Sequence, residues 1–132
     1  MSENGLENSS IRLHVLVVDD SAVSRKFLER KLTQLGYDVF AVEGGALALE
    51  RTRVVVPSAI VTDLRMPDMD GFDLCRAVRV DPALSLVAVI VTSANEISES
   101  ERQTAREAGA SAMVTRTATL QELICALDNV CQ

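Results

Sequence analysis

Three acidic residues stand where apolar runs of the sequence end. Asp19 and Asp20 follow Val15–Val18, and Asp63 follows Ala59–Thr62. Runs of this kind are typical of buried parallel strands, and neighbouring strands would bring the three carboxylates together at one edge of a sheet. Like charges this close are unfavourable unless a cation joins them or one of them is protonated. The spacing therefore predicts a metal site in which one of the three carboxylates is not needed to hold the ion.

Composition and charge limit what this chain can be. Its 132 residues suit one domain, and 48% hydrophobic but only 3% aromatic residues predict a core of Val, Leu, Ile and Ala, as in a sheet covered by helices on both faces. The net charge of −6 argues against a nucleic-acid-binding surface. Since no apolar run reaches the ~18 residues of a membrane span, we expect no membrane contact and a cytoplasmic protein.

The cysteines and the single histidine carry no site of their own. Cys75, Cys125 and Cys131 form no C-x-x-C pair, and an odd number without metal-ligand spacing indicates reduced thiols in a reducing compartment. His14 lies in an apolar strand run and not on an exposed helix face, so we expect it to be structural.

Strand and helix patterns alternate along the chain. The expected strands are Leu13–Val18, Tyr37–Ala41, Ser58–Thr62, Leu86–Val91 and Ala112–Thr115. The expected helices run from the cap Ser21 to Gly36, over about Gly45–Arg51 and Phe72–Val80, from Ser98 to Gly109, and from Thr119 to the end of the chain. The pairs Ser98–Glu101 and Thr119–Glu122 have the spacing of capping boxes.

The expected buried faces follow from helical spacing. The first helix would bury one face made of Val23, Phe27, Leu28, Lys31, Leu32 and Leu35, and the last helix a face made of Leu120, Leu123, Ile124, Leu127 and Val130. Five strand–helix units with short links predict an open, doubly wound parallel sheet, whose ligands bind beyond the carboxyl ends of its strands. Thr92 and Ser93 would follow the fourth strand there, and Arg116 the fifth.

Four segments together resemble the receiver domain of bacterial two-component response regulators. They read V-L-V-V-D-D-S-A-V-S-R, I-V-T-D-L-R-M-P-D-M-D-G, V-I-V-T-S and E-A-G-A-S-A. The second is the most specific, with an Asp four residues before Pro and eight before Gly. The resemblance implies a flavodoxin-like (βα)5 fold with strand order 2-1-3-4-5 over residues 11–132, after a disordered lead-in at residues 1–10.

The resemblance also implies a Mg²⁺ site and a phosphoacceptor. Asp63 matches the residue that receives a phosphoryl group from the histidine of a sensor kinase. Asp20 matches the direct Mg²⁺ ligand, Asp19 the partner that holds a metal-bound water, and the backbone carbonyl of Arg65 the remaining protein ligand. Mg²⁺ prefers oxygen ligands and keeps several waters, so few carboxylates suffice. The side chain of Arg65 would either steer water near the phosphoryl group or lie on the surface.

Two further residues match the phosphoryl site, and the family implies the partners. Thr92 matches the hydroxyl residue that bonds the phosphoryl oxygen and changes position on activation, and Ser93 the neighbour whose backbone N–H reaches the same group. A sensor histidine kinase or a phosphotransfer protein would supply the phosphoryl group. A downstream protein or output domain, or a second copy in a homodimer, would bind the face formed by the fourth helix, fifth strand and fifth helix.

The sequence departs from the family around the fifth strand. Arg116 stands where the family has a lysine, and Thr117 where a proline follows. Arginine keeps the charge but is a planar fork, and a cis bond before Thr117 would cost ~3–4 kcal/mol, so we expect a trans bond. Met113 occupies the place of an aromatic switch residue. The segment between Thr92 and Arg116 is two residues longer than is common in the receiver family. We expect metal binding and phosphorylation to be retained while the readout is altered.

Other functions remain open at this stage. A degenerate pseudo-receiver would bind partners without phosphorylation, and the departures at Met113, Arg116 and Thr117 favour it. A phosphatase or other hydrolase would need a general acid where Arg65 stands, and a flavin-binding domain would need a phosphate-binding loop where the acidic pair stands.

Asp68 and Asp70 fail the spacing of a calcium loop and are expected to be solvated turn residues. The leading interpretation is a phosphoaccepting switch that is not an enzyme acting on other molecules.

Overall fold

The computed structural model describes residues 12–117 and 119–131. The expected lead-in at residues 1–10 lies outside this range. Within the described residues no helix combines the length and the hydrophobicity that a membrane crossing requires. The three cysteines are free, as expected.

Strands and helices alternate as the sequence predicts. In chain order they are β1 (His14–Val18), α2 (Ala22–Gln34), β2 (Asp38–Val42), α3 (Gly45–Thr52), β3 (Ala59–Asp63), α4 (Gly71–Val80), β4 (Ala88–Ser93), α5 (Glu99–Ala108), β5 (Ala112–Thr115) and α6 (Gln121–Val130). In the described part of the chain the five strands form one parallel sheet of order β2-β1-β3-β4-β5. The expected flavodoxin-like fold is confirmed.

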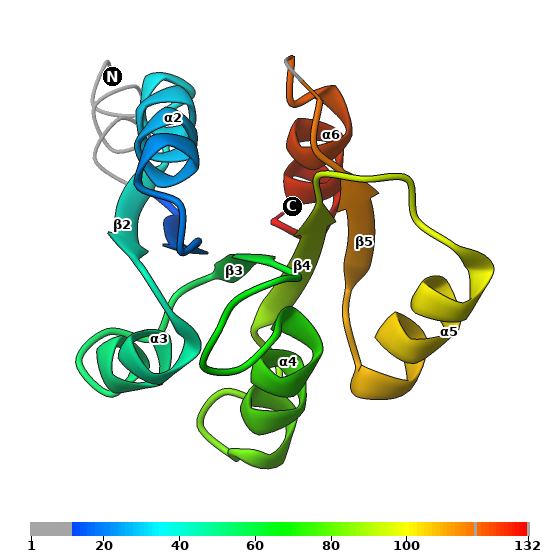
Figure 1. The fold of residues 1–132 in the computed structure, drawn as a ribbon. Helices are drawn as coiled ribbons and strands as arrows, with labels where there is room; N and C mark the ends of the chain where they lie inside the picture. The colour runs from blue at the N-terminus through cyan, green and yellow to red at the C-terminus, as the bar shows by residue number, and fades with distance from the viewer. Residues whose placement is uncertain (1–11, 118, 132) are drawn as a thin grey trace, which may run out of the picture.

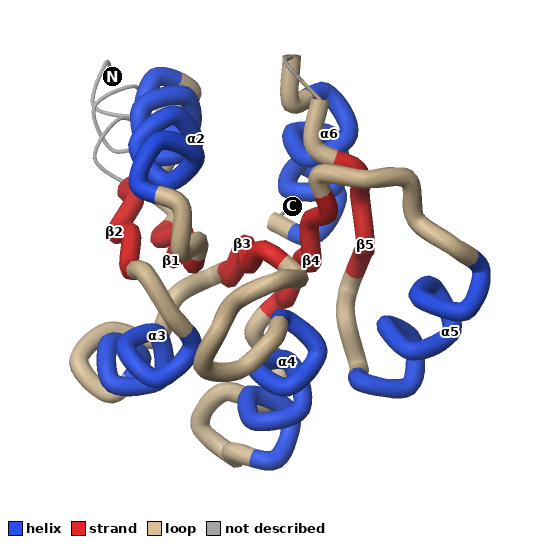
Figure 2. Tube along the Cα trace, viewed as in Figure 1, coloured by secondary structure: helices blue, strands red, loops and turns tan. Residues whose placement is uncertain are grey.

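Helices cover both faces of this sheet. Helices α2 and α6 lie on one face, and α3, α4 and α5 lie on the other (Figure 1), while the strands lie side by side between the two layers (Figure 2). Successive residues of a strand point to opposite faces, so Val17 packs with Leu28 and Leu123 whereas Val18 packs with Leu74. Burial on both faces explains why the strand sequences are continuously apolar.

The ends of four strands differ from the sequence-based expectation, by one residue in β1, β2 and β3 and by two residues in β4. Strand β3 includes Asp63, and β4 covers Ala88–Ser93 instead of Leu86–Val91, so Thr92 and Ser93 belong to the strand and do not follow it. Leu86 lies in the preceding turn and is 97% exposed. Its apolar character suggested a strand residue, but the chain needs these positions to turn between α4 and the sheet.

The buried face of α2 is narrower than its sequence indicates. Leu28 and Leu32 are buried, whereas Val23 is 83% exposed and Phe27 and Leu35 are also exposed. Leu28 and Leu32 are four residues apart and share one stripe of the helix, while Val23 and Phe27 share the neighbouring stripe. Only one stripe can face the sheet, so the prediction was wrong for Val23 and Phe27. It was also wrong for Leu35, which follows the last residue of α2 and occupies its C-cap.

Three side-chain caps were predicted at helix starts, and two of them form. The Ser21 side chain accepts a hydrogen bond from the Ser24 N–H, and Ser98 with Glu101 forms the expected capping box. The Thr119–Glu122 box does not form. Leu120 is 1% exposed and occupies the cap position with a positive φ of 57°, and no side chain caps the helix there. The Glu122 carboxylate instead accepts a hydrogen bond from the Thr115 N–H.

The loop after β3 supplies a cap that the sequence analysis missed. Asp70 and Asp73 form a capping box at the start of α4, and Asp68 accepts a hydrogen bond from the Ala46 N–H at 3.1 Å near the start of α3. Both acids lie in the loop and remain at least partly exposed, as expected, but each also satisfies a backbone donor at a helix start, a role that the sequence analysis did not assign. Asp68 thereby ties the loop after β3 to α3.

Removing the α4 cap should have a measurable cost. We expect Asp70→Ala to lower the free energy of unfolding by about 1 kcal/mol, because the Asp73 N–H loses its acceptor. Urea denaturation followed by circular dichroism measures this. Ser98→Ala, which removes the equivalent cap of α5, is the matched comparison and should cost a similar amount. An unchanged midpoint for Asp70→Ala would show that the cap contributes nothing.

Candidate functional site

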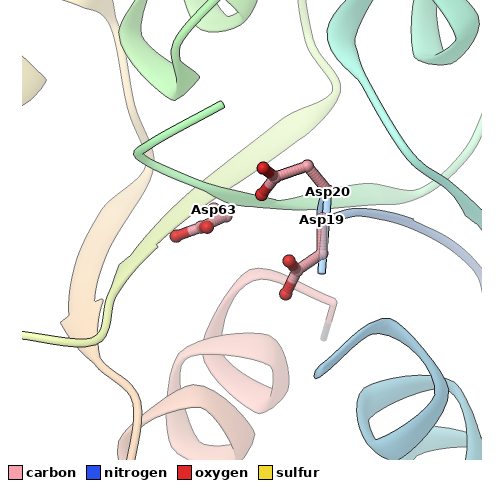
Figure 3. Close-up of side chains that lie close together, drawn as sticks. All are labelled: Asp19, Asp20 and Asp63. Atoms are coloured by element: carbon pink, nitrogen blue, oxygen red, sulfur yellow. The ribbon is translucent and has the colours of Figure 1, made fainter. Parts of the chain in front are cut away.

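Three carboxylates meet at the carboxyl end of the sheet. One oxygen from each of Asp19, Asp20 and Asp63 lies within 4.8 Å of the others, and Figure 3 shows the three side chains together. Their environments differ, since Asp19 is buried, Asp20 is exposed and Asp63 is intermediate. The convergence expected from the sequence is confirmed.

Strand pairing positions these acids. Val18 of β1 lies opposite Thr62 of β3, so the next residues, Asp19 and Asp63, leave neighbouring strands at the same level. The start of α4 comes very close to this edge, because the Gly71 N–H donates to the Leu64 carbonyl at 2.9 Å. A Cβ on Gly71 would lie 2.8 Å from the Asp63 carbonyl oxygen. The glycine is needed because no side chain fits between the helix and the strand end.

The Asp19 carboxylate is fully engaged with protein donors. Its Oδ1 accepts a hydrogen bond from the Ser21 N–H at 2.9 Å. Its Oδ2 accepts one from Ser24 Oγ at 2.5 Å and one from Arg116 Nη1 at 2.8 Å. The side chain is 1% exposed. Burial of a carboxylate without such partners would be very costly, so these donors make the buried position possible.

Arg116 spans two of the three acids. Its Nη1 contacts Asp19 and also donates to Ser24 Oγ at 2.8 Å, while its Nη2 lies 3.8 Å from Asp63 Oδ1. The Arg116 side chain is 17% exposed, and its backbone N–H donates to the Ser93 carbonyl. Within the described residues there is no cis peptide bond, which confirms the expected trans bond before Thr117. The arginine therefore contacts Asp19 and approaches Asp63 without a cis bond.

Asp63 has a raised pKa. Burial is the main cause, since it disfavours the charged carboxylate; the Arg116 guanidinium opposes this effect and the Asp19 carboxylate adds to it. A carboxylate that is poorly stabilised by the protein alone is one that a bound cation would stabilise. The electrostatics thus fit the metal site that the sequence predicts.

This raised pKa gives a prediction about stability. A carboxyl group whose pKa is raised by folding destabilises the protein at pH values above that pKa, because its charged form is less favourable in the folded state. We therefore expect Asp63→Asn to raise the Tm by several degrees at neutral pH in EDTA. The gain should shrink as the pH falls and the wild-type carboxyl group becomes protonated. Thermal melts over a pH series measure this, and a gain that is constant with pH would contradict the explanation.

The remaining predicted residues surround Asp63. Thr92 lies opposite Asp63 in the β3–β4 pairing and is fully buried, with its hydroxyl 3.4 Å from the Thr62 carbonyl oxygen. Ser93 is buried beside it, and its Oγ accepts from the Asn95 N–H. The Arg65 side chain points away and pairs with Glu101 of α5 at 3.2 Å, so the surface interpretation of this side chain fits the structure better.

The donors at this edge fit a magnesium ion. Asp20 lines an open cavity together with Arg65, Met66, Pro67 and Asp70. Carboxylate and carbonyl oxygens are the ligands that Mg²⁺ prefers, and the open side leaves room for the waters that it retains. Asp20 is the member of the acidic trio that lines this cavity, and neither Asp19 nor Asp63 does.

Sequence reasoning missed Ser24. It was quoted within the first family segment, yet no role was given to it. The available signal was its spacing, because a hydroxyl five residues after Asp19 lies in the first turn of α2 and can turn back toward the strand end. Arg25 was also missed, and its Nη1 donates to the Asp19 backbone carbonyl at 2.8 Å.

Comparisons with known proteins agree on one family. The family model described as the response regulator receiver domain matches residues 15–128. A probable transcriptional regulator, ycf27 of Porphyra purpurea, is 35% identical over 109 residues, which are 83% of this chain and 43% of that protein. The response regulator PleD of Caulobacter vibrioides is 35% identical over 102 residues, which are 77% of this chain and 22% of PleD. This chain thus spans less than half the length of either relative.

The fold comparison gives the same result. The chemotaxis protein CheY4 of Vibrio cholerae superposes with a TM-score of 0.85 at 27% identity, covering 91% of this chain and 99% of CheY4. A putative response regulator from Chloroflexus aurantiacus superposes with a TM-score of 0.82 at 28% identity, covering 91% of this chain and 98% of that one.

Proposed function

The chain belongs to the family of response regulator receiver domains, and we propose that it accepts a phosphoryl group on Asp63 in a Mg²⁺-dependent reaction. The family acts in two-component signalling, so the domain is a signalling module and not a classical enzyme. The observation that carries the proposal is the meeting of Asp19, Asp20 and Asp63 at one edge of the sheet.

Asp63 is suited to act as the nucleophile. A carboxylate oxygen of Asp63 would attack the phosphorus of a phosphohistidine, the P–N bond would break, and the histidine would leave with a proton. The product is an acyl phosphate, which is reactive and suits a transient signal. Asp20, Asp63 and the Arg65 carbonyl would hold Mg²⁺, with Asp19 acting through a water. The ion would supply positive charge to the incoming phosphoryl group.

Arg116 supplies the second positive charge that the product requires. A phosphoryl group adds a charge of roughly −1.5 to −2 next to carboxylates that are already negative. Arg116 Nη2 lies 3.8 Å from Asp63 Oδ1, which is too long for a hydrogen bond but close to the place where a phosphoryl oxygen would lie. The Thr92 hydroxyl, opposite Asp63 in the sheet, is the second group that we expect to bind this oxygen.

The proposal is tested with the wild-type protein. Incubation with Mg²⁺ and a small phosphodonor such as acetyl phosphate should add the mass of one phosphoryl group, as measured by intact-protein mass spectrometry. EDTA should prevent the gain, and hydroxylamine should remove it, because hydroxylamine cleaves acyl phosphates. No gain at saturating donor and Mg²⁺ would refute phosphorylation of this domain.

A pseudo-receiver is the second candidate, and one observation favours it. The Asp19 carboxylate is buried and occupied by Ser24 and Arg116, as in a module that has no use for a metal. The exposed Asp20 and the raised pKa of Asp63 argue against it, because a fixed interaction module gains nothing from this repulsive cluster. A Mg²⁺-dependent rise in the Tm would favour the receiver, and its absence would favour the pseudo-receiver.

The partners follow from the same proposal. A sensor histidine kinase or a phosphotransfer protein would donate the phosphoryl group, in the cytoplasm, where the three free cysteines would stay reduced. An output domain, a downstream protein or a second copy would bind the α5-β5-α6 face. The Arg65–Glu101 ion pair joins the loop after the phosphoacceptor to α5 and offers one physical connection to that face. Met113, on β5, is buried against the helix layer that contains α5.

A further inference from the structure

Asp19, Ser24 and Arg116 form a closed hydrogen-bonded group, called here the Asp19 cluster. Arg116 Nη1 donates to both Asp19 Oδ2 and Ser24 Oγ at 2.8 Å, and the Ser24 hydroxyl donates to the same Asp19 oxygen at 2.5 Å. Each of the three side chains thus contacts the other two. Ser24 accepts from the arginine and donates to the aspartate, which no apolar side chain at this position could do.

The Asp19 cluster leaves Asp19 little capacity for a metal. With the Ser21 N–H included, three donors use three of the roughly four acceptor positions of a carboxylate. The Asp19 side chain is 1% exposed, so little of it is open to an ion from solvent. Arg116 also places a positive charge next to both Asp19 and Asp63, where it repels an incoming cation. The same contacts that stabilise buried Asp19 therefore oppose metal binding.

We propose that Ser24 and Arg116 act as an internal competitor of Mg²⁺ at this site, and that metal binding requires the Asp19 cluster to open. This inference rests on the metal site of the proposed function. Ser24 acts as a positioning residue, because it holds Arg116 on Asp19 and does not itself reach Asp63. Opening the cluster would release the guanidinium at the same moment as Asp19 becomes available. Arg116 would then be free to turn toward the phosphoryl group on Asp63.

The geometry of the Arg116 guanidinium allows it to contact both other members of the Asp19 cluster at once. A guanidinium has several N–H donors in a rigid plane, so Nη1 satisfies Asp19 and Ser24 while Nη2 faces Asp63. The fixed backbone hydrogen bond from the Arg116 N–H to the Ser93 carbonyl keeps the base of the side chain at the end of β5. The guanidinium can therefore swing between the two carboxylates without a change in the sheet.

Mg²⁺ titration by calorimetry, in wild-type protein and four variants, tests the proposal. Arg116→Met removes the competing charge and should tighten Mg²⁺ binding on the order of tenfold. Ser24→Ala keeps every charge but breaks the Asp19 cluster, and should tighten binding roughly threefold. Ser24→Thr retains the hydroxyl and should bind like the wild type. Arg25→Met is the matched control, because Arg25 is a second cation at Asp19 that contacts only its backbone carbonyl.

A second measurement does not depend on affinity. In ¹⁵N-labelled wild-type protein the Arg116 side-chain N–H signals should be sharp and protected without metal, and should shift and exchange faster when Mg²⁺ saturates the site. Ser24→Ala should show the faster exchange already without metal. Signals that Mg²⁺ does not move would overturn the proposal.

The affinity results separate this proposal from the proposed function. Unchanged or weaker Mg²⁺ binding in both Arg116→Met and Ser24→Ala would overturn the competition, and so would an equal effect of Arg25→Met, which would indicate a general charge effect. In each of these cases a wild-type protein that binds Mg²⁺ and is phosphorylated still supports the receiver function. Binding that appears only in Arg116→Met would support the competition strongly. A complete absence of binding in all variants would refute both.

Discussion

Asp63→Ala is expected to reduce phosphorylation by at least about a hundredfold, because it removes the only group in the described site that is placed to attack a phosphoryl donor. Asp63 ends β3 beside Thr92, with Arg116 Nη2 at 3.8 Å. The proposed function assigns Asp20 to the metal, and Asp19 is occupied by protein donors, so neither is expected to substitute for it. Intact mass after incubation with Mg²⁺ and acetyl phosphate measures the loss.

A second acid in the same loop gives the control. Asp68 lies five residues after Asp63 and accepts a hydrogen bond from the Ala46 N–H, so Asp68→Ala should weaken the attachment of α3 but retain the mass gain. If Asp63→Ala still gained a phosphoryl group, and peptide mapping placed it on another residue, the assignment of the phosphoacceptor would be wrong. Melting curves of both variants must show a folded protein.

The backbone positions of the acidic site could be predicted from the sequence. Continuous apolar runs indicate strands buried on both faces, and parallel strands of one sheet present their carboxyl ends at one edge. Asp19 and Asp63 follow two such runs, so their convergence depends only on β1 and β3 being neighbours. The same reasoning gave the order of helices and strands. Strand ends were less exact, as at Thr92 and Ser93, because apolar residues also occur in the turn before β4.

The contacts among side chains could not be predicted in this way. Arg116 has many rotamers, and in the folded structure its guanidinium contacts both Asp19 and Ser24, a residue 92 positions away in the chain. Nothing in the local sequence around either residue indicates the other. A long cation near several carboxylates selects the one that is most buried and has the most additional donors, and this is a property of the folded structure.

The exposed apolar residues of α2 illustrate a related limit. Helical spacing groups Val23, Phe27 and Leu28 on one broad side, and only the packing of α2 and α6 on the same sheet face decides which stripe is buried. Leu120 shows a different limit, because it is buried at the cap position of a helix start where the pattern of Thr119 and Glu122 predicted a side-chain cap. Sequence patterns therefore identified the elements reliably, but not how each element is rotated or how it begins.

Asp20→Asn is expected to weaken Mg²⁺ binding on the order of a hundredfold while leaving the metal-free protein folded. Asp20 is the exposed member of the acidic trio, lines the open cavity, and belongs to no ion pair among the described residues. Removing its charge also relieves repulsion with Asp63, so the Tm in EDTA should stay the same or rise. Calorimetric titration and thermal melts measure the two effects.

Asp19→Asn provides the contrast that makes this result specific. Arg116 loses its buried charge partner, which should lower the free energy of unfolding by roughly 2–4 kcal/mol. Without metal, Asp19 thus binds the arginine and Asp20 stays exposed, so the two neighbouring acids are expected to respond differently to the same substitution. If Asp20→Asn bound Mg²⁺ as tightly as the wild type, the ion would have to be held by Asp63 and Asp19 alone. The arrangement of Arg116 on Asp19 argues against that outcome, because both acids would then lose their cationic neighbour.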